Sequence, residues 1–251
     1  MSMESDPQHT ERVWTVGGVP FNVRVAVIIT LATILPIINH YHNVAGLLGG
    51  VWEHLQHRPT AHAYDQVLFY FLIPMLVIVL GFRESPKRYG FCFGKWREGL
   101  LWTLAVCPPM LIALWFVVRY SDMQTYYAWT AYGRVHGMDQ VDSGMAAIPT
   151  SAHLAMAYQS TLALVPWEFL WRGFVLFGLA RVIGPGPAIF VQAMPFALLH
   201  IGKPEIETIT TIFGGVGFGF VAWRTDSFLY AFIIHWVILV FTNLAAVGVF
   251  G

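Results

Sequence analysis

Charged residues are scarce in this sequence of 251 residues, because only 11% are Asp, Glu, Lys or Arg while 57% are hydrophobic. A soluble globular domain carries roughly 25% charged residues, so the composition excludes an ordinary soluble protein. Positive charge is not in excess either, since 14 Lys and Arg balance 14 Asp and Glu. No basic surface that binds nucleic acid is therefore expected, and the predicted partner is the lipid bilayer.

Cysteine is nearly absent, with only two residues in the chain. Cys92 lies in a basic loop and Cys107 in an apolar run, so we do not expect them to form a disulfide framework. The first 19 residues are polar and lack the apolar core of a cleavable signal peptide. The sequence thus offers neither disulfide cross-links nor a visible secretion signal.

Long apolar runs are what the sequence does contain, and a helix needs about 20 apolar residues to cross a bilayer. The candidate helices cover residues 22–40, 66–82, 98–118, 152–181, 186–200, 208–223 and 227–249. We predict an all-α, polytopic transmembrane helix bundle with about seven helices. Residues 1–21 form a polar N-terminal segment, and residues 22–251 form a single membrane domain.

The loop at residues 83–97 carries five of the 14 basic residues. Positively charged loops stay in the cytoplasm, so this loop is predicted to lie inside. The loops at 41–65 and 119–151 then lie outside. We expect an integral, multi-pass protein, located in the plasma membrane of a prokaryote.

Ionisable residues inside predicted spans are costly and usually face the interior of a bundle. Glu168 and Arg172 are four residues apart in Pro-Trp-Glu-Phe-Leu-Trp-Arg-Gly-Phe, so they share one helix face and can pair. His200, His235 and Asn243 follow on later segments. One interpretation is structural: the Glu–Arg pair and single histidines hold helices together. The other is general acid–base chemistry, in which Glu168 takes a proton from water and His or Asn side chains stabilise an oxyanion.

These residues, in this order, resemble the CAAX prenyl protease and bacteriocin-processing family of intramembrane proteases. That family has an EExxxR motif, then FxxxH, then a last motif of the form HxxxN. Here Glu168 and Arg172 match the first motif, Phe196 to His200 match the second, and His235 matches the third. The resemblance spans roughly residues 160–245, within a catalytic core at about 152–249.

The resemblance implies a glutamate-type endopeptidase that needs no metal or other cofactor. Glu168 and His200 would activate the attacking water, and Arg172 would orient Glu168. His235 and Asn243 would stabilise the oxyanion. The implied partner is an unknown membrane-associated protein or peptide substrate.

The sequence departs from the family pattern at two positions. Trp167 replaces the first of the two adjacent acids, which is often taken as the catalytic one, and Leu239 stands where the last motif has Asn. Either Glu168 has become the base, or the chemistry has shifted, or the protease is inactive. Glu205 and Glu207 are candidate substitutes for the missing acid, although we favour solvated loop acids as their interpretation.

Histidines are concentrated in the loop at 41–65, where His54, His57 and the nearby Glu53 resemble zinc ligands. We interpret this loop as a polar interfacial segment and predict no metal site. Two alternatives to a protease remain open. An inactive family member would act as an immunity or scaffold factor, and a proton-coupled transporter would use its buried Glu as a relay.

Overall fold

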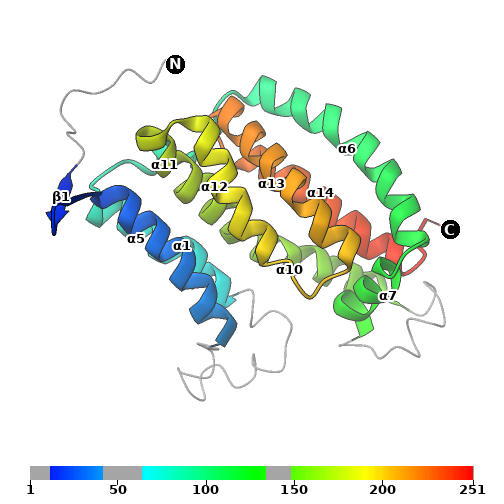
Figure 1. The fold of residues 1–251 in the computed structure, drawn as a ribbon. Helices are drawn as coiled ribbons and strands as arrows, with labels where there is room; N and C mark the ends of the chain where they lie inside the picture. The colour runs from blue at the N-terminus through cyan, green and yellow to red at the C-terminus, as the bar shows by residue number, and fades with distance from the viewer. Residues whose placement is uncertain (1–11, 42–63, 134–147, 251) are drawn as a thin grey trace.

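The computed structural model describes residues 12–41, 64–133 and 148–250. The histidine-rich part of the first outside loop, with His54 and His57, lies outside these described residues. Within them the architecture is an all-α helix bundle, as predicted, apart from one small hairpin at the N-terminus (Figure 1).

Six helices are long and apolar enough to cross a membrane in the part of the chain that the structure describes. They are Val23–Tyr41, Tyr64–Gly81, Trp96–Arg119, Thr150–Ile183, Glu205–Thr225 and Leu229–Ala246. The first is α1, and the third, fifth and sixth are α6, α13 and α14. Length and composition therefore support an integral, multi-pass membrane protein.

Two of these spans combine several helical stretches. The second contains η2 (Val67–Leu72), α5 (Ile73–Leu76) and η3 (Val77–Gly81), and the fourth contains α10 (Thr150–Glu168), η7 (Phe169–Val175) and α11 (Leu176–Ile183). The stretches η2, η3 and η7 are π-helical. Such wide turns are rare and frequently occur at functional sites.

The seventh predicted helix exists as α12 (Pro185–Leu198), which has 14 residues and is shorter than a full span. It packs between α11 and α13 (Figure 1). Gly215 of α13 allows the close approach to α12, because a Cβ there would lie 3.0 Å from the Cβ of Ala193. The side chain of Gln192 donates a hydrogen bond across this contact to the carbonyl oxygen of Gly215, at 2.8 Å.

The remaining elements are short. The strands β1 (Val13–Val16) and β2 (Val19–Asn22) pair antiparallel, and the 3-10 helix η4 covers Pro86–Tyr89. The hairpin was not predicted within the polar N-terminal segment; Gly17 and Gly18 both have positive φ, which suits its two-residue turn. The helix α7 (Met123–Ala128) and the π-helical η5 (Trp129–Gly133) lie after the third span.

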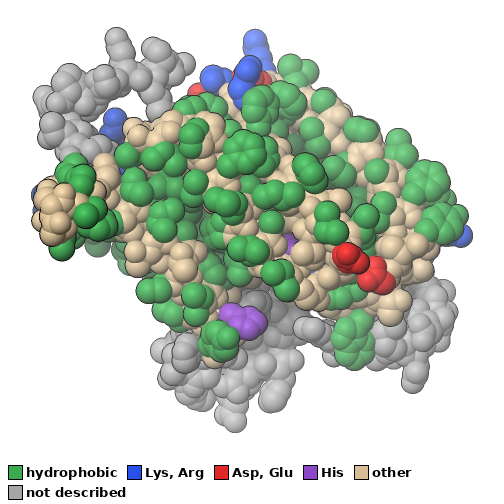
Figure 2. Space-filling view, viewed as in Figure 1, with side chains coloured by type: hydrophobic (Ala, Val, Ile, Leu, Met, Phe, Trp, Pro, Cys, Tyr) green, Lys and Arg blue, Asp and Glu red, His purple; other side chains and the backbone are tan. Residues whose placement is uncertain are grey.

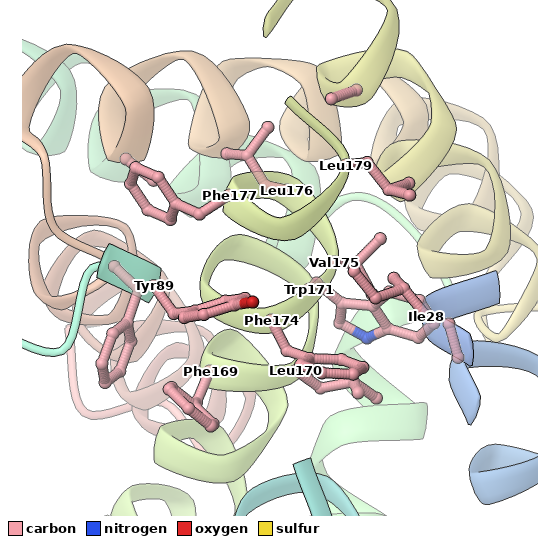
Figure 3. Packing of buried hydrophobic residues seen from close by; sticks show 14 of the residues in the cluster. Ile28, Tyr89, Phe169, Leu170, Trp171, Phe174, Val175, Leu176, Phe177 and Leu179 are labelled. Atoms are coloured by element: carbon pink, nitrogen blue, oxygen red, sulfur yellow. The ribbon is translucent and has the colours of Figure 1, made fainter. Parts of the chain in front are cut away.

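The core is centred on the fourth span. Residues 169–175 are all buried, and Phe169, Trp171 and Phe174 have no exposed surface (Figure 3). The second span, α1, α12 and α13 all pack against this segment. The face of the molecule shown in Figure 2 carries many hydrophobic side chains and few charged ones. This surface suits a lipid environment.

Charged side chains that join neighbouring elements cluster where the cytoplasmic loops are predicted. Glu84 accepts hydrogen bonds from Arg24 at 2.8 Å and from Arg181 at 2.7 Å. Nearby in sequence, Lys95 pairs with Asp226 at 3.1 Å. Loop 82–95 thus connects the ends of the first, fourth and fifth spans. The predicted orientation across the membrane stays a prediction.

Candidate active site

Glu168 and Arg172 form a buried ion pair in the middle of the fourth span. Arg172 Nη1 lies 3.1 Å from Glu168 Oε1, and both side chains have 0% exposed surface. The sequence brings them together because four residues make about one helical turn. A charge in this setting is tolerated only when it is paired, so the pair explains how both residues remain in an apolar core.

His235 of α14 completes a three-residue cluster with this pair. Its Nδ1 lies 2.6 Å from Glu168 Oε1. A carboxylate can only accept a hydrogen bond, so Nδ1 carries the proton and donates it. This contact fixes the orientation of the imidazole ring and leaves Nε2 for other partners.

The Arg172 guanidinium is also enclosed by aromatic rings. Its central carbon lies 3.9 Å from the centre of the Phe196 ring and 5.2 Å from that of Phe218. Both rings also contact His235, with centres 6.0 Å and 5.2 Å from the imidazole centre. Cation–π attraction partly replaces the hydration that Arg172 loses.

His200 follows α12 and belongs to the turn that leads to α13. Its Nδ1 lies 2.8 Å from the carbonyl oxygen of Phe196, and a carbonyl only accepts, so Nδ1 is the donor. Burial lowers the pKa of His200 to about 3, with a further contribution from the positive charge of Lys203. The ring is therefore neutral near pH 7, and its Nε2 carries a lone pair that can accept a hydrogen bond.

A cavity of about 890 Å³ brings His200 and His235 to one surface. Helices α7, α10, α12, α13 and α14 all contribute to its walls, which are mostly apolar. The polar residues at the end near His200 include Tyr127, Lys203 and Glu207. Such a concave, largely apolar space with a few polar groups is typical of a ligand site.

Glu168 and Arg172 lie behind this wall, because both are fully buried whereas His235 lines the cavity. In this conformation a contact with His235 joins Glu168 to the cavity wall. Its predicted role in activating water is untested, and the geometry adds another role, which is to orient His235.

Trp167 lines the cavity at the position of the missing first acid. Its ring centre lies 6.2 Å from that of His200 and 5.8 Å from that of Phe196, and it also contacts Tyr70. The indole of Trp167 therefore lies between His200 and the rest of α10. No carboxylate from the first motif fills that place.

Asn243 is not brought to the cluster. It lies eight residues beyond His235 on α14, which is about 12 Å along a helix. Its side chain is 5% exposed and its Nδ2 lies 3.3 Å from the sulfur of Met156. The structure thus gives Asn243 a packing contact, and its predicted role at the oxyanion stays a prediction.

Glu207 is the acid that our preferred interpretation of the sequence undervalued. We had expected Glu205 and Glu207 to be loop residues, but both belong to the first turn of α13. Glu205 is exposed, whereas the Glu207 side chain is only 15% exposed and faces the cavity. The short separation of Glu207 from His200 in the sequence indicated that they could lie close together. Only the fold of the intervening turn brings the two side chains together.

No group of three or more His, Cys, Asp or Glu side chains suited to a metal ion occurs in residues 12–41, 64–133 and 148–250. The predicted absence of a metal stays a prediction, since the histidine-rich loop is not among these residues. The described site offers histidine and carboxylate groups for proton transfer.

Residues 148–241 match a protein family described as type II CAAX prenyl endopeptidase Rce1-like. This segment contains Glu168, Arg172, His200 and His235, and it stops short of Asn243. No curated protein and no solved structure matches the chain. The match supports the resemblance to the CAAX protease family and, in general terms, a membrane-embedded protease that acts on a peptide.

Proposed function

Because residues 148–241 carry the Rce1-like CAAX protease signature, we propose that the chain is an intramembrane endopeptidase. It hydrolyses a peptide bond of a membrane-associated protein or peptide that enters the cavity. The observation that carries this proposal is that His200 and His235 line one cavity while a buried carboxylate orients one of them.

The two histidines have complementary roles in this reaction. The neutral ring of His200 accepts a proton from the attacking water at Nε2, because its Nδ1 already donates to the Phe196 carbonyl. When His235 carries protons on both nitrogens, Nδ1 donates to Glu168 and Nε2 donates to the oxyanion. Glu168 and Arg172 act through His235 by holding its ring and balancing its charge.

The apolar lining of the cavity suits a lipid-modified or otherwise hydrophobic substrate. The matched family is described by its action on prenylated CAAX sequences, so a peptide ending in a farnesylated CAAX sequence is the first defined probe. An otherwise identical peptide without the farnesyl group tests whether the lipid is required.

One experiment tests the proposal without assuming a substrate. Membranes containing the wild type, His200→Ala, His235→Ala or His153→Ala are compared by mass spectrometry of peptide termini. His153 is the matched control, because it pairs with Tyr132 at 2.6 Å rather than lining the cavity. We expect new termini with the wild type and His153→Ala, and about 10²- to 10⁴-fold fewer with the two site variants.

The same experiment separates the alternatives. Identical termini in all four membranes, with equal protein levels, would refute an endopeptidase. The preferred hypothesis would then be an inactive immunity or scaffold factor, which the presence of Trp167 beside His200 favours. Proton-coupled uptake into vesicles that depends on Glu168 would instead indicate a transporter.

A further inference from the structure

Glu207 holds a carboxylate at the end of the cavity where His200 lies. Its Oε1 is 4.0 Å from His200 Nε2, a separation too long for a direct hydrogen bond. The fold keeps this arrangement in place, because the Thr208 hydroxyl donates to the carbonyl oxygen of His200 at 2.8 Å. The first turn of α13 is thereby fixed to the histidine.

The two facing atoms are both acceptors when His200 is neutral. His200 Nδ1 uses its proton on the Phe196 carbonyl, so Nε2 carries a lone pair. A water molecule about 2.8 Å from each of two acceptors 4.0 Å apart would subtend roughly 90°, close to its own H–O–H angle. One water can therefore donate to His200 and to Glu207 at the same time.

Hydrogen bonds from two neighbouring side chains hold the Glu207 carboxylate in place. The Tyr127 hydroxyl lies 2.7 Å from both carboxylate oxygens, and Lys203 Nζ lies 2.8 Å from Oε1. Burial and the charge of Glu207 raise the pKa of Tyr127 well above its usual value, so the phenol stays protonated and donates. A carboxylate has about four acceptor positions, so two donors leave room for a water.

We propose that Glu207 is the carboxylate that activates the hydrolytic water together with His200, as a substitute for the first-motif acid that Trp167 replaces. The acid thus comes from α13 rather than from the first motif on α10. This inference rests on the proposed endopeptidase function and adds to it the identity of the water-activating acid. Glu168, behind the cavity wall, is then a positioning residue for His235.

The reaction balances with water as the only co-reactant. The water oxygen forms a bond to the carbonyl carbon of the scissile peptide while one water proton passes to the His200 and Glu207 pair. That proton then moves to the amide nitrogen as the carbon–nitrogen bond breaks. One product gains a carboxyl group and the other an amine, and the pair returns to its starting protonation.

Glu207→Gln and Glu205→Gln form a matched pair of variants for the test. Both change an acid to an amide in the same helical turn, but only Glu207 faces the cavity. Each protein is purified into liposomes and assayed with a fluorogenic peptide. The peptide carries a farnesylated CAAX end or spans the bond whose new termini were mapped.

We expect Glu207→Gln to lower kcat about 100-fold or more with little change in KM, and Glu205→Gln to match the wild type. His200→Ala and the double variant Glu207→Gln/His200→Ala should be equally slow, because both residues act on one water. Tyr127→Phe removes a hydrogen bond to Glu207 but leaves its charge. It should therefore lower kcat far less than Glu207→Gln does.

Three results would overturn the inference. Wild-type turnover by Glu207→Gln, while the two histidine variants are inactive, would refute the role of Glu207 and leave the endopeptidase proposal intact. An equal loss in Tyr127→Phe, accompanied by a lower thermal stability in both, would assign Glu207 a structural role. Wild-type protein without any peptidase activity would remove the proposed function and this inference with it.

Discussion

The buried pair of Glu168 and Arg172 allows stability and catalysis to be measured separately. Glu168→Gln keeps the size of the side chain but leaves the Arg172 charge without its counter-ion in a site with 0% exposure. Arg172→Met removes the opposite charge and leaves a buried carboxylate. The double variant Glu168→Gln/Arg172→Met contains neither charge and fills nearly the same volume.

Breaking a buried ion pair by removing one partner costs about 3–5 kcal/mol, whereas replacing both partners by neutral groups is often neutral. Part of the Arg172 charge remains stabilised by the Phe196 ring at 3.9 Å, so we expect about 3 kcal/mol for Glu168→Gln. At about 2–4 °C per kcal/mol for a chain of this size, the melting temperature falls by roughly 10 °C. The double variant should recover most of that loss.

Thermal unfolding in detergent micelles, followed by fluorescence of the Trp residues, gives the melting temperatures of the wild type and the three variants. Peptide turnover by the same samples gives the second readout. The double variant should be stable but inactive, because His235 has lost the charge-assisted hydrogen bond to the Glu168 carboxylate that holds its ring. Losses that simply add in the double variant would refute the ion-pair reasoning, and full turnover by it would refute the role of Glu168 in holding His235.

Two further predictions concern the ion pairs around Glu84 and the contact between α12 and α13. Burial alone would raise the pKa of Glu84, but hydrogen bonds from Arg24 and Tyr89 and the charge of Arg181 lower it to about 2. Because the pKa of Glu84 is lower in the folded than in the unfolded protein, its ionised form stabilises the fold by about 3 kcal/mol. This contribution is complete above pH 4.5 and disappears as the pH falls towards 2. The melting temperatures of the wild type and Glu84→Gln should therefore converge over that range. Gly215→Leu should destabilise the bundle by about 1–3 kcal/mol through overpacking against Ala193, while Gly214→Leu, with nothing within 4 Å of its Cβ, should leave the melting temperature unchanged.

The fold could be predicted from the sequence because lipid imposes a simple rule on helix length and composition. The apolar runs at 22–40 and 98–118 correspond closely to α1 and α6, and 152–181 to the fourth span. The rule does not say which shorter apolar helices cross the bilayer. The run at 186–200 is apolar enough for a span, but α12 ends at Leu198 and is too short to be counted as one.

The candidate site was predictable only where local spacing determines the contact. Glu168 and Arg172 pair because they are one turn apart, and this contact was expected. The bond from His235 to Glu168 joins two helices separated by 67 positions, and the sequence indicated only that both lie in the bundle. Asn243 shares the helix of His235, yet helical rise carries it away from the cluster.

With Trp167 in place of the first acid, residues that stabilise the bundle can be distinguished from residues that act on the substrate. Losing either charge of the Glu168–Arg172 pair destabilises the bundle whether or not the protein cleaves anything, so the presence of that pair is not evidence for catalysis. His200 and Glu207 are different. Tyr127 and Lys203 hold the Glu207 carboxylate, and its Oε1 faces His200 Nε2 across 4.0 Å at the edge of a cavity. Two facing acceptors gain no stability from their proximity, but they can both bind a water. The chemistry of this protein is therefore tested more sharply at Glu207 than at the carboxylate of its first motif.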